Sequence, residues 1–546
     1  MGRPEPLTGL APSAHIDTFT RDNLPEPATW PELIFTLPEL RYPARLNCAV
    51  ELLDRVARDK GGDRRCLLTP TEEWTYGDLV RASDQVAAVL SGELGLVPGN
   101  RVLLRGPNNP WLVAAWFGVL KAGGVVVATM PLLRAGELAV MGEIASSQFA
   151  ICDHRFTADL EAAAIPGMRI VAYGAGRSDD LVARCRRHER GFRAVDTAAD
   201  DVCLLAFTSG TTGRPKATMH FHRDVLAIAD TFSRHVLKPG ADDLFAGSPP
   251  LAFTYGLGGE VVFPLRAGAA SLLLEQAPPE RLLEAIVAHR VSVLFTAPTA
   301  YRGMLASAAS YDLSSLRRCV SAGETLPAAT WHGFKAATGI GIIDGIGSTK
   351  LLHIFISAAD EDIRPGTTGR AVPGYVAEVQ DDSGRPVSDG EIGLLAVKGP
   401  TGCRYLAGDR QENYVRNGWN LTGDVYIQDG EGYFAYQARA DDMIISAGYN
   451  IAGPEVESAL LKHPAVAETA VVGAPDAERG MIVKAFVVLA AGVAPTPGLA
   501  RQLQDFVKRE IAPYKYPRAI EFVDSLPRTA TGKLQRFRLR ERAVTA

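Results

Sequence analysis

A run rich in glycine and hydroxyl residues follows an apolar segment and constrains the fold more than any other part of the chain. Residues 202–207 (Val-Cys-Leu-Leu-Ala-Phe) predict a buried strand. Residues 207–216 then read Phe-Thr-Ser-Gly-Thr-Thr-Gly-Arg-Pro-Lys. Glycine lets the backbone approach a ligand, N–H and hydroxyl groups donate to phosphate, and lysine neutralises charge. The segment predicts a polyphosphate loop, with an ordinary turn as the alternative. It is not a Walker loop, because Lys216 follows Pro215.

Helix-like and strand-like segments alternate before this loop. Residues 101–104 predict a strand, residues 111–121 a buried helix and residues 123–127 a second strand. This alternation predicts an α/β fold in which helices flank a largely parallel sheet. The chain contains no G-x-G-x-x-G motif, so a Rossmann dinucleotide site is not supported.

The pattern changes near residue 370, where short strands separated by turns replace the alternation. A polar break at residues 439–442 precedes a compact segment of helices and strands. We therefore predict two domains, residues 1–440 and residues 441–546. The large N-terminal domain would hold parallel-rich sheets with flanking helices, and the smaller α+β domain has an ordinary domain size.

Composition excludes several classes of protein. The 546 residues carry a net charge of −5, which gives no general electrostatic attraction to nucleic acid or an anionic membrane. The seven cysteines include no C-x-x-C pair, which argues against a zinc site or a disulfide framework. The first residues lack the apolar segment of a secretory signal, and the most apolar stretches contain Lys121 and Arg266. We expect a cytoplasmic protein with neither nucleic-acid nor membrane partners, as a monomer or homodimer.

Further segments occur in an order that resembles the adenylate-forming superfamily, which contains acyl-CoA synthetases, firefly luciferase and peptide-synthetase adenylation domains. These segments are Ser321-Ala322-Gly323-Glu324, Asp344-Gly345-Ile346-Gly347-Ser348-Thr349, Trp419-Asn420-Leu421-Thr422-Gly423-Asp424, Ser446-Ala447-Gly448-Tyr449-Asn450-Ile451 and Pro527-Arg528-Thr529-Ala530-Thr531-Gly532-Lys533. Together with residues 207–216 they span much of the chain, so the resemblance is specific.

The resemblance implies an ATP site. Two of the loops would enclose the adenine, and Thr349 would contact the α-phosphate as a neutral hydroxyl donor. Asp424 and Arg439 would hold the ribose, because a carboxylate can accept hydrogen bonds from two vicinal hydroxyls. The implied ATP-binding residues are Thr208, Ser209, Gly210, Thr211, Thr212, Lys216, Gly323, Glu324, Asp344, Gly345, Asp424 and Arg439.

The resemblance also implies a C-terminal domain that rotates between two half-reactions. Lys533 would bridge the substrate carboxylate and the α-phosphate, so Lys533 and Thr349 are the predicted catalytic residues. Asp441 matches the hinge position of the family. The predicted coenzyme A residues are Ser446, Ala447, Gly448 and Tyr449.

One position departs from the family, which usually has glutamate after the threonine. That glutamate helps to hold Mg²⁺, whereas the residue here is Lys350, and lysine cannot ligate a hard cation. The triphosphate and water could hold the ion, another carboxylate could substitute, or Lys350 could itself neutralise phosphate. We still expect ATP, Mg²⁺ and coenzyme A to be required, and we assign no protein ligand to the metal. An inactive site is a further alternative.

The acid-binding residues of the family correspond to Phe253, Thr254, Tyr255, Gly256, Gly347 and His353. Phe253 and Tyr255 would form aromatic walls, Gly256 with Gly258 and Gly259 would leave room, and His353 would lie opposite. Flat walls with one polar group suit an aryl acid, although such aromatic residues are often simply core residues.

Other segments resemble benzoate-CoA and 2-aminobenzoate-CoA ligases. They are Asp22-Asn23-Leu24-Pro25, Trp30-Pro31-Glu32, residues 37–43, Leu46-Asn47-Cys48, residues 352–355 and residues 441–451. The last segment is nearer the aminobenzoate group, so we expect an ATP-dependent aryl-CoA ligase for 2-aminobenzoate, with benzoate next. The rival hypotheses are an adenylation enzyme that loads a carrier-protein thiol and a non-catalytic adenylate-binding protein.

Overall fold

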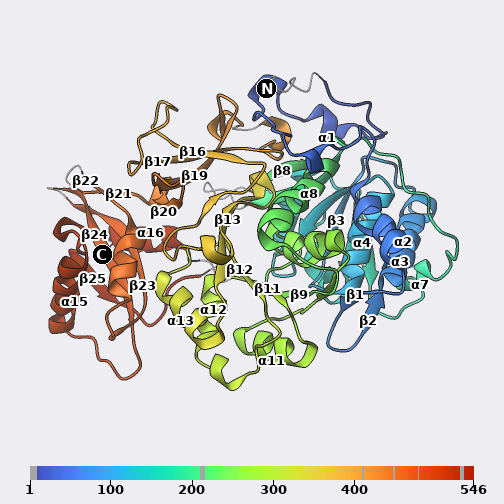
Figure 1. Ribbon diagram of the computed structural model, residues 1–546. Coiled ribbons are helices and arrows are strands. Elements are labelled where there is room, and N and C mark those ends of the chain that lie inside the picture. The colour runs from blue at the N-terminus through green and yellow to red at the C-terminus, as the bar shows by residue number, and fades with distance from the viewer. Residues whose placement is uncertain are drawn as a thin grey trace. The chain divides into compact units, whose positions relative to one another are not determined.

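The computed structural model describes residues 9–208, 215–408, 411–446, 449–476, 479–528 and 534–545. The chain divides into two compact units, one of residues 1–377 with 397–420 and one of residues 378–396 with 421–546. The expected α/β architecture, with a larger N-terminal and a smaller C-terminal part, is confirmed (Figure 1). The division into units tests neither the predicted domain boundary after residue 440 nor the predicted hinge at Asp441, and both stay predictions. Among the described helices, none has the length and apolar character needed to span a membrane.

The first unit contains a six-stranded sheet in the order β6-β5-β3-β4-β7-β8. Its strands are β3 (Arg101–Arg105), β4 (Val125–Thr129), β5 (Phe149–Asp153), β6 (Arg169–Tyr173), β7 (Val202–Thr208) and β8 (Lys216–Phe221). All neighbours run parallel except β7 and β8, which are antiparallel. The predicted strand at residues 202–207 is therefore present, and its burial explains its continuous apolar sequence.

A nine-stranded sheet in the same unit has the order β15-β14-β13-β12-β11-β9-β10-β1-β2. Its strands are β1 (Arg65–Leu68), β2 (Glu73–Thr75), β9 (Leu244–Gly247), β10 (Ala270–Leu272), β11 (Val293–Thr296), β12 (Arg318–Ser321), β13 (Ile342–Gly347), β14 (Ile354–Ser357) and β15 (Arg370–Ala371). Its central neighbours are parallel, and antiparallel pairs occur only towards its two edges.

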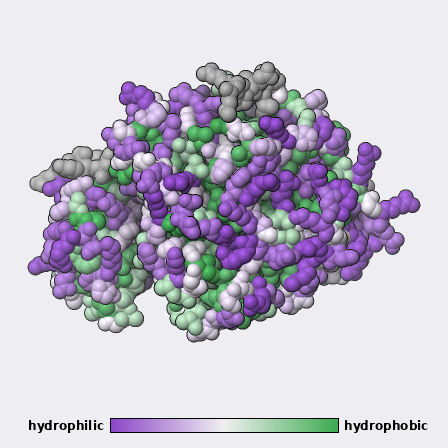
Figure 2. All heavy atoms as spheres, viewed as in Figure 1, coloured by the Kyte–Doolittle hydropathy of each residue, from purple (hydrophilic) through white to green (hydrophobic). Residues whose placement is uncertain are grey.

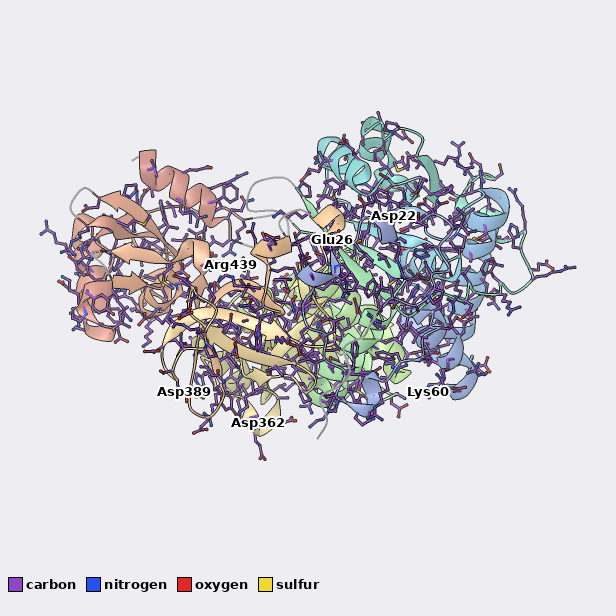
Figure 3. The ribbon with its side chains drawn as sticks, turned by 90° about the horizontal axis from the view of Figure 1, so that it is seen from above. Asp22, Glu26, Lys60, Asp362, Asp389 and Arg439 are labelled. Carbon is purple, nitrogen blue, oxygen red and sulfur yellow. The ribbon has the colours of Figure 1, made fainter. Side chains whose placement is uncertain are left out.

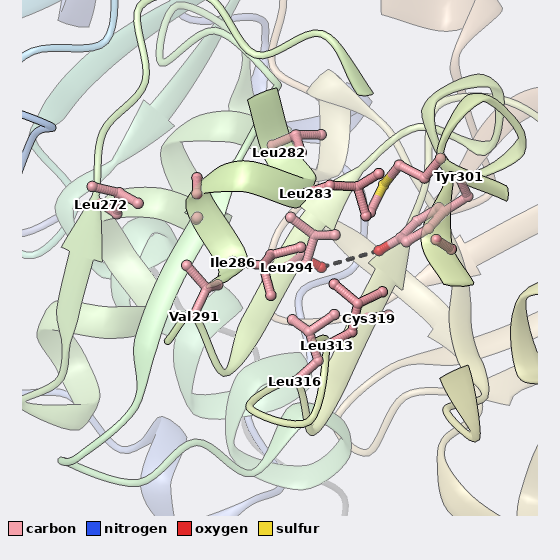
Figure 4. Packing of buried hydrophobic residues seen from close by; sticks show 14 of the residues in the cluster. Leu272, Leu282, Leu283, Ile286, Val291, Leu294, Tyr301, Leu313, Leu316 and Cys319 are labelled. Atoms are coloured by element: carbon pink, nitrogen blue, oxygen red, sulfur yellow. Dashed lines mark hydrogen bonds between the residues drawn. The ribbon is translucent and has the colours of Figure 1, made fainter. Parts of the chain in front are cut away.

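The helices of the first unit pack on these sheets and bury an apolar core. They are α1 (Phe19–Asp22), α2 (Arg55–Lys60), α3 (Tyr76–Ala88), α4 (Pro110–Lys121), α5 (Ala135–Ile144), α6 (Thr157–Ala162), α7 (Leu181–Cys185), α8 (His222–Ile228), α9 (Thr254–Leu257), α10 (Phe263–Ala267), α11 (Pro279–His289), α12 (Pro298–Leu305) and α13 (Ala328–Thr338). In one core cluster, Leu282 and Ile286 of α11 lie beside Leu294 (Figure 4). The Tyr301 hydroxyl donates to Leu294 O over 3.2 Å and to Val320 O over 3.0 Å, so this buried polar group is satisfied.

The parallel strands β9, β11, β12 and β13 end at the same edge of the nine-stranded sheet. The segments that follow β9, β12 and β13 begin at residues 248, 322 and 348, and they contain most of the predicted acid and adenine residues. Ligands in open α/β sheets bind outside the carboxyl ends of the strands. The topology therefore places these predicted residues where such a fold binds ligands.

The second unit contains two further sets of strands. One comprises β16 (Val376–Gln380), β17 (Ile392–Lys398), β19 (Trp419–Gln428) and β20 (Phe434–Arg439). The first two residues of β19 belong to the first unit, and there they pair with the short β18 (Val415–Arg416). The other comprises β21 (Ile444–Ser446), β22 (Tyr449–Ile451), β23 (Val466–Asp476), β24 (Gly480–Leu489) and β25 (Ala519–Phe522).

Three helices complete the second unit: α14 (Gly453–Leu460), α15 (Pro497–Glu510) and α16 (Arg536–Thr545). Leu499, Leu503 and Val507 are buried at four-residue spacing along α15, which is the apolar stripe of an amphipathic helix. Thr496 caps this helix by accepting from Leu499 N over 3.1 Å. Hydrophilic side chains cover much of the face that Figure 2 shows.

Candidate active site

The predicted phosphate loop connects two antiparallel strands. Thr208 at the end of β7 pairs with Lys216 at the start of β8. The predicted ligands Ser209, Gly210, Thr211 and Thr212 lie outside the described residues. Alternate residues of β8 point to opposite faces of the sheet. Ala217, Met219 and Phe221 belong to the hydrophobic core, so Lys216 projects from the other face.

Lys216 and Lys350 both lie against Tyr414. The Lys216 Nζ is 4.9 Å from the centroid of the Tyr414 ring and 3.1 Å from its hydroxyl. The Lys350 Nζ is 4.4 Å from the same centroid, and Lys350 is buried. Lys350 belongs to a short 3₁₀ turn (Thr349–Leu351) after β13, and Tyr405 packs edge-on against Tyr414. Three distant segments therefore form one cluster, which we call the two-lysine cluster (Lys216, Lys350 and Tyr414).

Thr349 opens the same 3₁₀ turn. Ser348 caps the turn by accepting from Leu351 N over 3.3 Å. The Thr349 backbone lies beside the buried His220. Burial, with a smaller contribution from Arg404, lowers the pKa of His220 to about 3, so this imidazole is neutral at physiological pH.

The predicted adenine residues follow β12 and lie within β13. Gly323 has a φ of 87°, a left-handed conformation that favours glycine, and Glu324 follows it. Burial raises the pKa of Asp344 to about 7, against weaker opposing effects of the Gly345 backbone and the Ser321 hydroxyl. Within the described part of the chain, Asp344 Oδ1 is buried and has no hydrogen-bond partner. The site thus offers an unused acceptor beside the predicted adenine position.

Aromatic rings surround His353, which lies at the far end of the β13–β14 connection. Its ring centroid is 4.5 Å from that of Phe263 and 5.7 Å from that of Tyr255, with Phe232 and Phe295 also adjacent. Burial lowers the pKa of His353 to about 3, so the ring is neutral. Its Nε2 lies 3.4 Å from Tyr255 O, while Nδ1 has no hydrogen-bond partner among the residues described.

The predicted aromatic walls differ from each other. Tyr255 is held in place by its hydroxyl, which donates to Val320 O over 3.0 Å and to Thr296 O over 3.2 Å. Phe253, which precedes α9, is 38% exposed and is not part of the buried cluster. Thr254 is the first residue of α9. Tyr255 can therefore present only its ring, which leaves His353 as the polar group of this cluster.

The expectation that three glycines leave room for the acid is wrong for the described conformation. A Cβ at Gly256 would lie 2.4 Å from Pro250 O, and one at Gly258 would lie 2.3 Å from the His353 ring. A Cβ at Gly259 would lie 2.6 Å from Phe295, so protein atoms fill these spaces. The glycines instead allow close packing of the surrounding backbone and rings. Gly347 is similar, since its Cβ would lie 2.7 Å from His353 O.

In the second unit, the strand register brings the two predicted ribose residues together. Asp424 of β19 faces Arg439 of β20, and Arg439 Nη1 lies 2.7 Å from Asp424 Oδ1. The side chain of Arg439 is labelled in Figure 3. The Asp424 N–H donates to the Thr422 hydroxyl over 3.0 Å, and that hydroxyl donates to Leu395 O. Gly423 has a φ of 81° and lies under the guanidinium. Thr422 therefore fixes the backbone at Asp424, and Arg439 holds its carboxylate as a charged partner.

The structure describes only some of the residues predicted for the hinge and for coenzyme A binding. Asp441 lies in a 3₁₀ turn (Ala440–Asp442), and Ser446 pairs with Tyr449 across the β21–β22 hairpin. Ser446 is buried, and its hydroxyl has no partner among the described residues. Ala447, Gly448 and Lys533 lie outside the described residues.

Two arginines of α16 form ion pairs with acidic residues that are distant in sequence. Arg540 pairs with Asp442, next to the predicted hinge residue. Arg536 donates to Glu457 Oε2 over 2.9 Å. The alternation of arginine with other residues gives no sign of these contacts, because each partner is distant in sequence.

Comparisons with known proteins identify the family. Residues 53–405 match the model of the AMP-binding enzyme family, and residues 455–533 match the model of the C-terminal domain of AMP-binding enzymes. The chain belongs to the AMP-binding enzyme family. The predicted membership of the adenylate-forming superfamily is thereby confirmed.

Several relatives act on aromatic acids. The benzoate–CoA ligase of Thauera aromatica is 35% identical over 92% of this chain and 98% of its own. The 4-hydroxybenzoate–CoA/benzoate–CoA ligase of Rhodopseudomonas palustris is 33% identical over 91% of this chain and 94% of its own. The crystal structure of the anthranilate CoA ligase AuaEII in complex with anthranoyl-AMP superposes with a TM-score of 0.88 at 36% identity, covering 93% of this chain and 99% of that one.

Proposed function

We propose that this enzyme is an ATP-dependent aryl-CoA ligase that activates 2-aminobenzoate, with benzoate as the next substrate. The observation that carries the proposal is that β13 and its connection to β14 bring residues predicted for both ends of the site onto one segment. Asp344 lies in β13, Thr349 and His353 lie in the connection, and His353 belongs to the aromatic cluster. The relatives whose names include benzoate or anthranilate support the aryl class of acid.

The proposed reaction has two half-reactions. The aryl carboxylate oxygen attacks the α-phosphorus of ATP, and pyrophosphate leaves to give aryl-AMP. The thiol sulfur of coenzyme A then attacks the acyl carbon, its proton is released, and AMP leaves. In the first step Lys533 would hold the carboxylate against the α-phosphate, and Thr349 would donate to the phosphate oxygens. In the second step the segment Ser446, Ala447, Gly448 and Tyr449 would line the path of the pantetheine arm.

The described residues around the two-lysine cluster do not suit a divalent cation. Mg²⁺ takes oxygen ligands in octahedral geometry, whereas this cluster offers two ammonium groups and a phenol. We therefore do not propose Lys350 as a Mg²⁺ ligand. A Mg²⁺ ion that arrives with ATP would be held by the phosphates and by water.

The rival functions make different predictions. An enzyme that loads a carrier protein would release pyrophosphate with an aryl acid but would form no thioester with free coenzyme A. A non-catalytic adenylate-binding protein would release no pyrophosphate with any acid. ATP–pyrophosphate exchange across a panel of substituted benzoates tests the first half-reaction, and we expect 2-aminobenzoate to give the highest kcat/KM. No exchange with any aryl acid would contradict the proposal.

His353→Ala is expected to reduce the preference for 2-aminobenzoate over benzoate by about three- to tenfold, the effect of losing one hydrogen bond. The neutral imidazole has a free Nδ1, which can accept from the ortho-amino group. The measurement is the ratio of kcat/KM for the two acids. The exposed His332 on α13 gives the control variant His332→Ala, and an unchanged ratio in His353→Ala would remove His353 from substrate selection.

The kcat/KM for ATP is expected to rise with pH through about 7, where Asp344 ionises. The raised pKa means that this carboxyl is neutral below that pH and charged above it, and a carboxylate is the better acceptor for the 6-amino group of adenine. Asp344→Asn should abolish this rise, because an amide does not titrate. If the variant kept the same pH profile, another group would be responsible.

A further inference from the structure

We propose that Lys350 and Lys216, which both lie against Tyr414, together form a polyphosphate clamp. The ligand is a polyphosphate anion, either the β,γ-phosphates of ATP or free pyrophosphate. The inference rests on the proposed function for its place in catalysis, but its geometry is independent of the acid.

Two positive charges converge on one aromatic ring. The Nζ atoms of Lys350 and Lys216 lie 4.4 Å and 4.9 Å from the centroid of Tyr414, although the two lysines are on separate segments. Two ammonium groups that share one ring repel each other, and a polyanion bound beside the ring would offset that repulsion. The charges of Lys350, Arg404 and Lys216 all act on the buried Cys403 thiol, which lies in the same positive field.

The fold fixes the positions of both lysines. Lys216 is the β8 residue that pairs with Thr208 of β7, so it lies at one end of the predicted phosphate loop. Lys350 follows Thr349 directly, in a turn capped by Ser348. Both ammonium groups are therefore tied to the segments predicted to contact the phosphates of ATP.

Neighbouring residues hold the Tyr414 ring in place. Gln411 accepts from Tyr405 N over 3.0 Å and donates to Cys403 O over 2.8 Å, and Tyr414 N donates to Gln411 O over 2.9 Å. Tyr405 then packs edge-on against the Tyr414 ring at 5.1 Å. A buried amide thus fixes the ring against which both ammonium groups lie, which limits the entropy that they lose on binding an anion.

The test is equilibrium binding by calorimetry in the presence of EDTA, with pyrophosphate, ATP and AMP as separate probes. Lys350→Met is expected to weaken pyrophosphate and ATP binding about ten- to a hundredfold, the effect of losing a charge-assisted hydrogen bond, and to leave AMP binding unchanged. AMP lacks the β- and γ-phosphates, so it reports general damage to the site. Lys335→Met is the matched control, because Lys335 also stacks on an aromatic ring (Trp331, 4.8 Å) but lies on the exposed side of α13.

A second variant keeps the proposal testable if the first is poorly folded. Lys350→Glu replaces the ammonium group with a carboxylate that can ligate Mg²⁺, so Mg²⁺ should strengthen its pyrophosphate binding at least tenfold more than it strengthens that of the wild type. An equal Mg²⁺ effect in both proteins would overturn the clamp, as would equal losses of AMP and pyrophosphate binding in Lys350→Met. These binding measurements contain no acid and no coenzyme A, so they test the clamp separately from the proposed function. If the wild type bound pyrophosphate through Lys350 but formed no aryl-CoA, only the proposed function would be contradicted.

Discussion

Replacing Lys533 with alanine is expected to slow formation of aryl-AMP by roughly 10²–10³-fold, which corresponds to about 3–4 kcal/mol of lost transition-state stabilisation. The lysine of the Pro-x(4)-Gly-Lys segment would hold two anions together as the carboxylate attacks phosphorus. It would have no such role when coenzyme A displaces AMP. The variant should therefore convert supplied aryl-AMP to aryl-CoA at close to the wild-type rate.

Single-turnover measurements of each half-reaction separate the two effects. Lys508→Ala is a suitable control, because Lys508 lies on α15 and pairs there with Asp505. This control should leave both rates unchanged. Equal losses in both half-reactions of Lys533→Ala would count against the role assigned to Lys533.

Arg404→Leu is expected to lower the free energy of unfolding of the first unit by about 3–5 kcal/mol, because it leaves a buried charge without its partner. Arg404 and Asp224 form an ion pair in which both side chains have zero exposure. The guanidinium also lies 4.0 Å from the Phe221 ring centroid, and Asp224 accepts from Phe221 N over 3.0 Å. Burial already raises the pKa of Asp224, so removal of the arginine further disfavours its charged form.

Urea unfolding followed by tryptophan fluorescence gives the change in stability. The control is Arg385→Leu, which removes an exposed pair with Asp381 and should leave the unfolding midpoint almost unchanged. An Arg404→Leu protein as stable as the control would show that the buried pair makes little net contribution. The double variant Arg404→Leu/Asp224→Leu should recover part of the loss, because it leaves no unpaired charge.

Local patterns were enough to predict many elements. The apolar run at residues 202–207 lies within β7, and the buried helix predicted at residues 111–121 lies within α4, because each pattern is set by burial of one strand or one helix. The ribose pair was also predictable through the family, and the register of β19 and β20 brings Asp424 and Arg439 into contact.

Features that depend on distant segments were not predictable in the same way. Lys350 could be recognised in the sequence as a departure from the family. Its proximity to Lys216 could not be predicted, because both lysines contact Tyr414 and no local pattern around Tyr414 indicates this. The glycines at positions 256, 258 and 259 suggested space, yet neighbouring rings and carbonyl groups fill it, because a missing Cβ permits close packing as well as an opening. Arg404 and Asp224 are 180 positions apart, so their pairing depends on tertiary structure.

The proposed reaction joins an aryl carboxylate to coenzyme A through an aryl-AMP. Its most direct test is mass-spectrometric detection of thioester, AMP and pyrophosphate after incubation with ATP, Mg²⁺, coenzyme A and either 2-aminobenzoate or benzoate. We expect equal amounts of the three products, with 2-aminobenzoate consumed faster than benzoate. Pyrophosphate release without any CoA thioester, or no consumption of either acid, would contradict it.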